Sequence, residues 1–96
     1  MESLFSVDAT PHYDRCARSL LRRHSEFDGV EEQAREILCV DPYNRTRTHG
    51  IKKLNDVESG EGQYRLRLGR FRFRYDIFDK EVILHSCGLR REDTYQ

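Results

Sequence analysis

The sequence predicts one α+β domain in which two helices cover one face of an antiparallel sheet. Two observations carry this prediction. Apolar residues recur at helical spacing in the first half of the chain, whereas from residue 64 onward they alternate with polar residues, as in a half-buried strand. A length of 96 residues leaves room for a single core, so we expect one domain over residues 1–96. The expected order is an N-terminal strand, a two-helix hairpin and a three-strand antiparallel meander.

The first half of the chain contains both helices and, before them, an N-terminal strand in the apolar stretch of Leu4, Phe5 and Val7 that ends at Thr10-Pro11. Thr10 followed by Pro11 is typical of a helix start, because the hydroxyl caps the first turn and proline lacks an N–H that has no partner there. The first apolar stripe consists of Tyr13, Cys16, Ala17, Leu20 and Leu21. The second consists of Val30, Ala34, Ile37 and Leu38. Pro42 ends the second helix.

The second half of the chain predicts strands over residues 64–68, 71–77 and 82–87. Gly69-Arg70 has the form of a two-residue type II′ turn, which fixes the register of the first hairpin. The expected cross-strand pairs are Leu68 with Phe71, Arg67 with Arg72, Leu66 with Phe73, Arg65 with Arg74, and Tyr64 with Tyr75. Asp79-Lys80 forms the second turn. The segment IKKL and a glycine-containing loop over residues 55–62 precede this hairpin.

The charge is balanced overall, with 17 basic and 17 acidic residues, but residues 64–74 hold five arginines and no acid. The register places four of them on one side of the sheet, a set that we call the arginine face: Arg65, Arg67, Arg72 and Arg74. Like charges directly across strands are destabilising, so this face predicts an anionic ligand that guanidinium groups can bind bidentately. Nucleic acid is the favoured ligand, and an acidic protein segment is the alternative. The arginines could also pair within the chain, for instance with Asp76 or Glu61.

Several classes of function are disfavoured. There is no apolar run of 18 residues, and the N-terminal segment is too short and polar for a signal peptide, so we expect a cytoplasmic protein without a membrane span. Cys16, Cys39 and Cys87 lack metal-ligand spacing and are expected as buried thiols, with no metal and no cofactor. His49 lies in a polar loop beside two lysines and is the best histidine candidate for acid–base chemistry.

The segments IKKL and GQYRLRLGRFRFRYDIFDKEVILHSCGLRREDTY resemble the RelE/ParE superfamily of type II toxin–antitoxin toxins. The resemblance covers residues 42–95, and the preceding strand and helices agree in order and size. It implies the RelE-like fold and, for RelE-type members, a ribosome-dependent endoribonuclease that cuts mRNA without a metal. The attack of the ribose 2′-OH on the adjacent phosphate then leaves a 2′,3′-cyclic phosphate.

The resemblance also implies roles for single residues. Arg72 and Arg90 would hold the scissile phosphate. Tyr95 or His49 would take the 2′-OH proton, and the other could supply a proton to the leaving 5′-oxygen. The remaining basic positions of the RNA-binding surface are Arg65, Arg67, Arg74, Lys52, Lys53 and Arg91.

The partners that the resemblance implies are mRNA, the ribosome and a cognate antitoxin whose acidic or amphipathic segment covers the arginine face. Operator DNA would be bound only through the antitoxin. The alternative within the superfamily is a ParE-type inhibitor of DNA gyrase, which shares the fold and has no nuclease activity.

Overall fold

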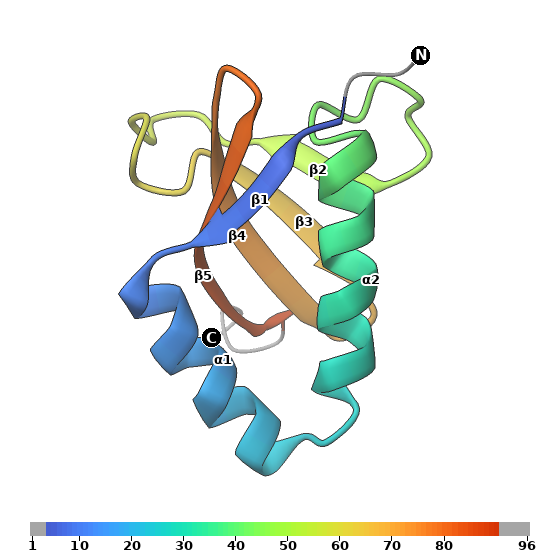
Figure 1. Cartoon of the computed structure of the whole chain (residues 1–96), viewed down its shortest axis with the longest axis vertical. Coiled ribbons are helices and arrows are strands. Elements are labelled where there is room, and N and C mark those ends of the chain that lie inside the picture. The colour runs from blue at the N-terminus through green and yellow to red at the C-terminus, as the bar shows by residue number, and fades with distance from the viewer. Residues whose placement is uncertain (1–3, 91–96) are drawn as a thin grey trace.

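Two helices lie against one face of a five-stranded sheet in the computed structural model, which describes residues 4–90 (Figure 1). The helices are α1, Pro11–Arg23, and α2, Phe27–Val40. The strands are β1, Ser6–Ala9; β2, Gly50–Lys53; β3, Tyr64–Leu68; β4, Phe71–Phe78; and β5, Glu81–Leu89. The predicted α+β class is confirmed, with both helices on the same side of the sheet.

Helix α1 begins as the sequence predicts. The Thr10 hydroxyl accepts a hydrogen bond from the Tyr13 N–H at 3.0 Å, and Pro11 is the first helical residue. The same hydroxyl donates to the His85 carbonyl of β5 at 3.2 Å, so the cap also attaches the start of α1 to the sheet. Short loops then lead from α1 to α2 and from α2 to β2.

The strand order is β1-β5-β4-β3-β2, with β1 parallel to β5 and all other neighbours antiparallel. All five predicted pairs of the β3–β4 hairpin are confirmed, from Tyr64–Tyr75 to Leu68–Phe71. The turn has Gly69 at a φ of 61°, a conformation that glycine adopts without strain.

One strand differs from the prediction. The IKKL segment contributes to β2, which pairs with β3 and extends the meander from three strands to four. Two adjacent lysines in a four-residue strand give no alternating pattern, so its conformation depends on the hydrogen bonds that β3 offers. β1 is the fifth strand and lies at the opposite edge of the sheet from β2, where it pairs with residues Glu81–Leu84 of β5.

The core lies between the sheet and the helices. Its fully buried members include Tyr13 of α1, Phe27 and Leu38 of α2, and Leu66, Phe73 and Tyr75 of the hairpin. Tyr64, which alternation with Arg65 predicts on the core side of the sheet, is half-buried and stacks on Tyr75 with ring centroids 5.5 Å apart. The alternation therefore places the arginine face on the opposite side of the sheet.

Within residues 4–90, no helix is long and apolar enough to cross a membrane. In the same part of the chain, no three His, Cys, Asp or Glu side chains are grouped as a metal site. The three cysteines are free thiols and half-buried.

Candidate functional site

Two rows of residues cross the sheet on the side away from the helices. The first row consists of Lys52, Arg65, Arg74 and Ser86, and the second of Gly50, Arg67, Arg72 and Gly88. Each row runs from β2 through β3 and β4 to β5. The arginine face is thus formed by two cross-strand arginine pairs, as the hairpin register predicts.

The two rows differ in what flanks the arginines. In the second row the Arg67–Arg72 pair lies between two glycines, so no neighbouring side chain in that row covers the guanidinium groups. Arg67 is exposed and forms no ion pair within residues 4–90. A cross-strand pair of like charges with open flanks is suited to a bound anion.

Arg74, in the first row, is held by the chain itself. Its Nε donates to the Gly62 carbonyl at 2.8 Å and its NH2 group to the Glu61 carbonyl at 3.0 Å. The sequence left open that arginines of this face pair within the chain. Arg74 does so, but its acceptors are backbone carbonyls and not carboxylates. Arg74 fixes the loop before β3, and less of its hydrogen-bonding capacity remains for a ligand.

Asp76 fixes the same loop. Its side chain is buried and accepts hydrogen bonds from the N–H groups of Gly60, Gly62 and Gln63 at 2.9 to 3.0 Å. Gly62 has a φ of 80°, and a Cβ there would lie 3.0 Å from the Cβ of Arg74. The sequence predicts Asp76 only as a possible arginine partner, and this anchoring role was not predicted. The signal was available: a lone acid within the arginine-rich hairpin, preceded by a loop with two glycines.

Arg90 lies just past β5, at the turn between β3 and β4. Its backbone N–H donates to the Arg70 carbonyl at 2.9 Å, and its guanidinium NH1 donates to the Gly69 carbonyl, also at 2.9 Å. Gly88, two residues earlier, lies opposite Arg72. The fold therefore brings the predicted phosphate-binding residues Arg72 and Arg90 to the same end of the sheet.

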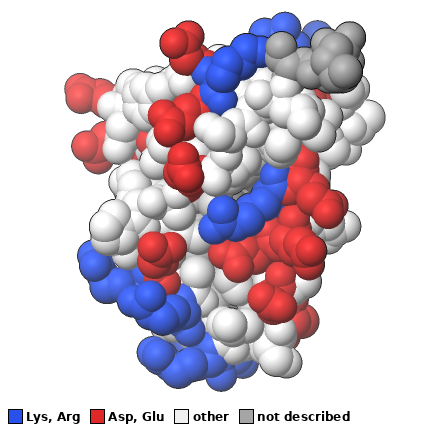
Figure 2. Space-filling model, viewed as in Figure 1, with Lys and Arg blue, Asp and Glu red and all other residues white. Residues whose placement is uncertain are grey.

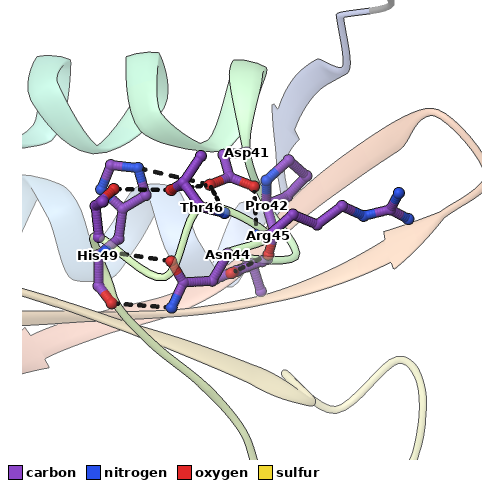
Figure 3. A network of polar contacts seen from close by, with 8 residues as sticks. Asp41, Pro42, Asn44, Arg45, Thr46 and His49 are labelled. Carbon is purple, nitrogen blue, oxygen red and sulfur yellow. Dashed lines mark hydrogen bonds and ion pairs between the residues drawn. The ribbon is translucent and has the colours of Figure 1, made fainter.

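His49 belongs to a different cluster, which Figure 3 shows at the C-terminal end of α2. Its Nε2 lies 3.8 Å from Asp41 Oδ2, while its backbone N–H and carbonyl both hydrogen-bond the Asn44 side-chain amide. The residue after it, Gly50, is opposite Arg67, so alternation directs the His49 side chain to the helix side of the sheet. The described structure does not bring His49 to the arginine face.

Asp41 organises this loop. It accepts hydrogen bonds from the Arg45 N–H and the Thr46 hydroxyl at 2.8 and 2.7 Å (Figure 3). Burial alone would raise the pKa of Asp41, but the bonds from Thr46 and Arg45 and the neighbouring His49 outweigh it and hold the pKa below its usual value. Asp41 is therefore an ionised anchor for the loop that contains His49.

The two lysines of β2 lie on opposite faces. Lys52 is opposite Arg65 and joins the arginine face, whereas Lys53 is opposite Tyr64, with its ammonium 5.8 Å from that ring. Arg91 and Tyr95, the last two predicted site residues, lie outside the described residues.

The described core tyrosines are poor candidates for the base. Burial raises the pKa of Tyr13 and Tyr75, and burial together with Tyr43 raises the pKa of Tyr64. In addition, the Tyr75 hydroxyl donates to the Pro42 carbonyl at 2.7 Å. These hydroxyls stay protonated at neutral pH, and the hydroxyls of Tyr13 and Tyr75 donate hydrogen bonds within the fold.

Comparison with solved structures identifies the fold. A chain of the RelBE2 toxin–antitoxin complex from Mycobacterium tuberculosis is similar to this chain, with a TM-score of 0.71, 23% identity and coverage of 94% of this chain and 95% of that one. A chain of the archaeal RelE–RelB complex from Pyrococcus horikoshii OT3 is similar with a TM-score of 0.65, 23% identity and coverage of 91% and 96%. The chain has the fold of a RelE toxin.

The likeness to these RelE structures is one of fold. No protein-family model and no curated protein sequence matches the chain. The RelE-like fold that the sequence resemblance implies is confirmed, because the structural likeness covers nearly all of both chains. The four-strand meander with β1 added in parallel is the arrangement on which the arginine face is built.

Proposed function

We propose that this chain is the toxin of a type II toxin–antitoxin system and that it cleaves mRNA on the ribosome with its arginine face, as a single domain over residues 1–96. The observation that carries the proposal is the Arg67–Arg72 pair, which lies between two glycines on the face of a RelE fold that the helices leave uncovered. A solvated surface without a ligand would be more stable with mixed charges at these positions. In this proposal the substrate is mRNA bound to the ribosome, so the protein acts in the cytoplasm.

The chemistry assigned to this face is transfer of a phosphate ester within the RNA. The ribose 2′-oxygen attacks the adjacent phosphorus, the bond from phosphorus to the 5′-oxygen breaks, and a 2′,3′-cyclic phosphate forms. Arg72 and Arg90 would bind the non-bridging oxygens and stabilise the negative charge that increases on them. Arg65 and Arg67 would orient the RNA and cannot serve as bases, because guanidinium groups do not deprotonate in proteins.

Two proton transfers accompany this step: one from the 2′-OH to a base and one from an acid to the 5′-oxygen. His49 and Tyr95 are the candidates that the resemblance supplies. The 3.8 Å approach of His49 to Asp41 and its place on the helix side favour a structural role for His49. We therefore assign the role of the base to Tyr95. His49 is the alternative, and mutagenesis of the two residues distinguishes between them.

A cognate antitoxin is the proposed regulatory partner. Both similar structures are complexes of RelE-type toxins with RelB antitoxins. An acidic segment that covers Arg67 and Arg72 would neutralise the pair and exclude RNA from the same face. Operator DNA would be bound by such a complex through the antitoxin.

The test is induced expression of the chain alone, followed by mapping of mRNA ends in the arrested cells. We expect growth arrest with cuts in translated mRNA, 5′-hydroxyl ends and cyclic or 3′-phosphate ends. Products with 5′-phosphates, or no cleavage by purified protein added to translating ribosomes, would contradict the proposal. Arrest with intact mRNA and inhibited DNA supercoiling by purified gyrase would establish the ParE-type alternative, which neither similar structure represents.

A further inference from the structure

A second basic surface lies on α1, on the opposite side of the sheet from the arginine face. Figure 2 shows basic side chains gathered over α1 and acidic side chains over α2. The basic residues of α1 are Arg15, Arg18, Arg22 and Arg23, and the acidic residues of α2 are Asp28, Glu31, Glu32 and Glu36. This segregation explains how a chain with zero net charge can present two cationic surfaces.

The arginines of α1 are exposed and available. None of the four forms an ion pair within residues 4–90, although α2 offers several carboxylates nearby in sequence. By contrast, Arg35 of α2 pairs with Glu31 at 3.7 Å, and Arg70 pairs with Glu26 at 3.4 Å. Charge balance within the fold is thus achieved at α2 and the hairpin turn but not on α1.

A groove of about 310 Å³ runs between α1 and the second half of β5. Its polar wall is one face of α1, formed by His12, Arg15, Ser19 and Arg23, and its other wall includes Cys87 and Gly88. Arg15 and Arg23 are eight residues apart, about 12 Å along a helix, which exceeds one nucleotide step. The wall therefore offers two guanidinium groups with a hydroxyl between them, the donors that phosphate oxygens bind.

The groove adjoins the arginine face across the edge of β5. β1 pairs with β5 only as far as Leu84, so no strand within residues 4–90 lies along that edge from His85 onward. Gly88 lines the groove and is also the residue opposite Arg72. A Cβ at Gly88 would meet no atom within 4 Å beyond its chain neighbours, so the space beside Gly88 is open.

We propose that the α1–β5 groove is a second RNA-binding site that holds the phosphate backbone of the RNA segment flanking the one on the arginine face. The RNA strand passes over Gly88, between Arg72 and the arginines of α1. The inference rests on the proposed function, since it extends the path of the same RNA. It assigns Arg15 and Arg23 to phosphate contacts and gives the groove no part in the chemistry.

The test measures binding of single-stranded RNA to the full chain by fluorescence anisotropy over a range of salt concentrations. The probes are 2′-O-methyl oligonucleotides of about four and about twelve nucleotides, which lack the reactive hydroxyl. The groove variant is Arg15→Gln with Arg23→Gln. The matched control is Arg35→Gln with Arg45→Gln, which removes the same two charges from α2 and the loop after it. Gly88→Leu places a large side chain where the RNA strand is proposed to cross β5, without changing the charge.

We expect the groove variant to bind the long probe about tenfold more weakly for each arginine lost. The slope of log affinity against log salt should fall by about 1.4, the value for two phosphate contacts on a single strand. The short probe should bind the groove variant as it binds the wild type. Gly88→Leu should weaken the long probe alone, and the control should leave both probes unchanged.

Equal losses in the groove variant and the control would show that net charge alone matters and would overturn the proposal. Unchanged binding of the long probe by the groove variant would overturn it while leaving the arginine face in place. Loss of affinity for a purified cognate antitoxin, with RNA binding unchanged, would assign the groove to an acidic protein segment instead. Failure of the wild type to bind either probe would contradict RNA binding by both surfaces.

Discussion

Arg67 and Arg72 lie directly opposite one another on β3 and β4, and each has a glycine as its outer neighbour in the same row. Like charges directly across two strands repel each other, and an anion bound between two guanidinium groups relieves this repulsion. This relationship links the fold to the proposed activity, because the same register that buries Leu66 and Phe73 places the pair on the opposite face of the sheet.

The first prediction concerns Arg72 and Arg90. Replacement of either by alanine should lower kcat for mRNA cleavage about 10²–10³-fold, because a preorganised donor to the phosphate oxygens is lost. The measurement is single-turnover cleavage on stalled ribosomes. Arg45→Ala serves as the control, since its guanidinium stacks 5.2 Å from the Tyr43 ring, away from the arginine face. Full activity of the Arg72 variant would exclude the assigned role.

The second prediction separates the two candidates for the base. Tyr95→Phe should lower the cleavage rate by about 10²–10⁴, whereas His49→Ala should leave it nearly unchanged in the folded protein. Because His49 contacts Asp41, His49→Ala should instead lower the midpoint temperature of thermal unfolding. A large loss of cleavage rate in His49→Ala, with a mild effect of Tyr95→Phe and equal stability, would transfer the base role to His49.

The third prediction concerns the loop before β3. Asp76→Ala should lower the free energy of unfolding by about 3 kcal/mol, because three backbone N–H groups lose their acceptor in a buried position. Urea denaturation checks this value. Glu58→Ala, an exposed change in the same loop, should stay within about 0.5 kcal/mol of the wild type. Similar stability of the two variants would contradict the anchoring role of Asp76.

The fourth prediction is a pH dependence that comes from Asp41. Its pKa is lower in the folded protein than the usual 3.8, so its contribution to stability is complete above that value and is lost as the pH falls through the folded pKa. Asp41→Asn should therefore flatten the decline in unfolding free energy between neutral pH and pH about 3. Asp79→Asn, at an exposed turn, is the control and should keep the wild-type decline.

The fifth prediction concerns Cys87. Burial, together with Cys16 and Glu31, raises the pKa of its thiol to about 12. At pH about 8 the thiolate fraction is then about 10³-fold below that of an ordinary cysteine, and alkylation of the native protein should be slowed to match. Mass spectrometry after iodoacetamide treatment, with and without urea, measures the difference. Equal rates in the two conditions would show that the thiol is not protected by the fold.

The sequence by itself determined the two helices and the β3–β4 hairpin, but not β2, which has no alternating pattern. A period of two with Gly69 at the turn leaves one register that buries Leu66 and Phe73, so the cross-strand arginine pairs could be predicted from local chemistry. Thr10 and Pro11 likewise mark the start of α1 because capping depends on adjacent residues alone. The ordered set of motifs was sufficient to predict the RelE-like fold.

Only the tertiary structure decided which residues outside the hairpin share the arginine face and which arginines of that face the chain itself holds. Lys52 and Lys53 are adjacent in sequence yet face opposite sides, because pairing of β2 with β3 sets their orientation. Arg74 is held by the carbonyls of a loop more than ten residues away, and His49 turns toward Asp41 at the end of α2. Contacts between distant segments form only when the chain has packed, so local sequence patterns do not predict them.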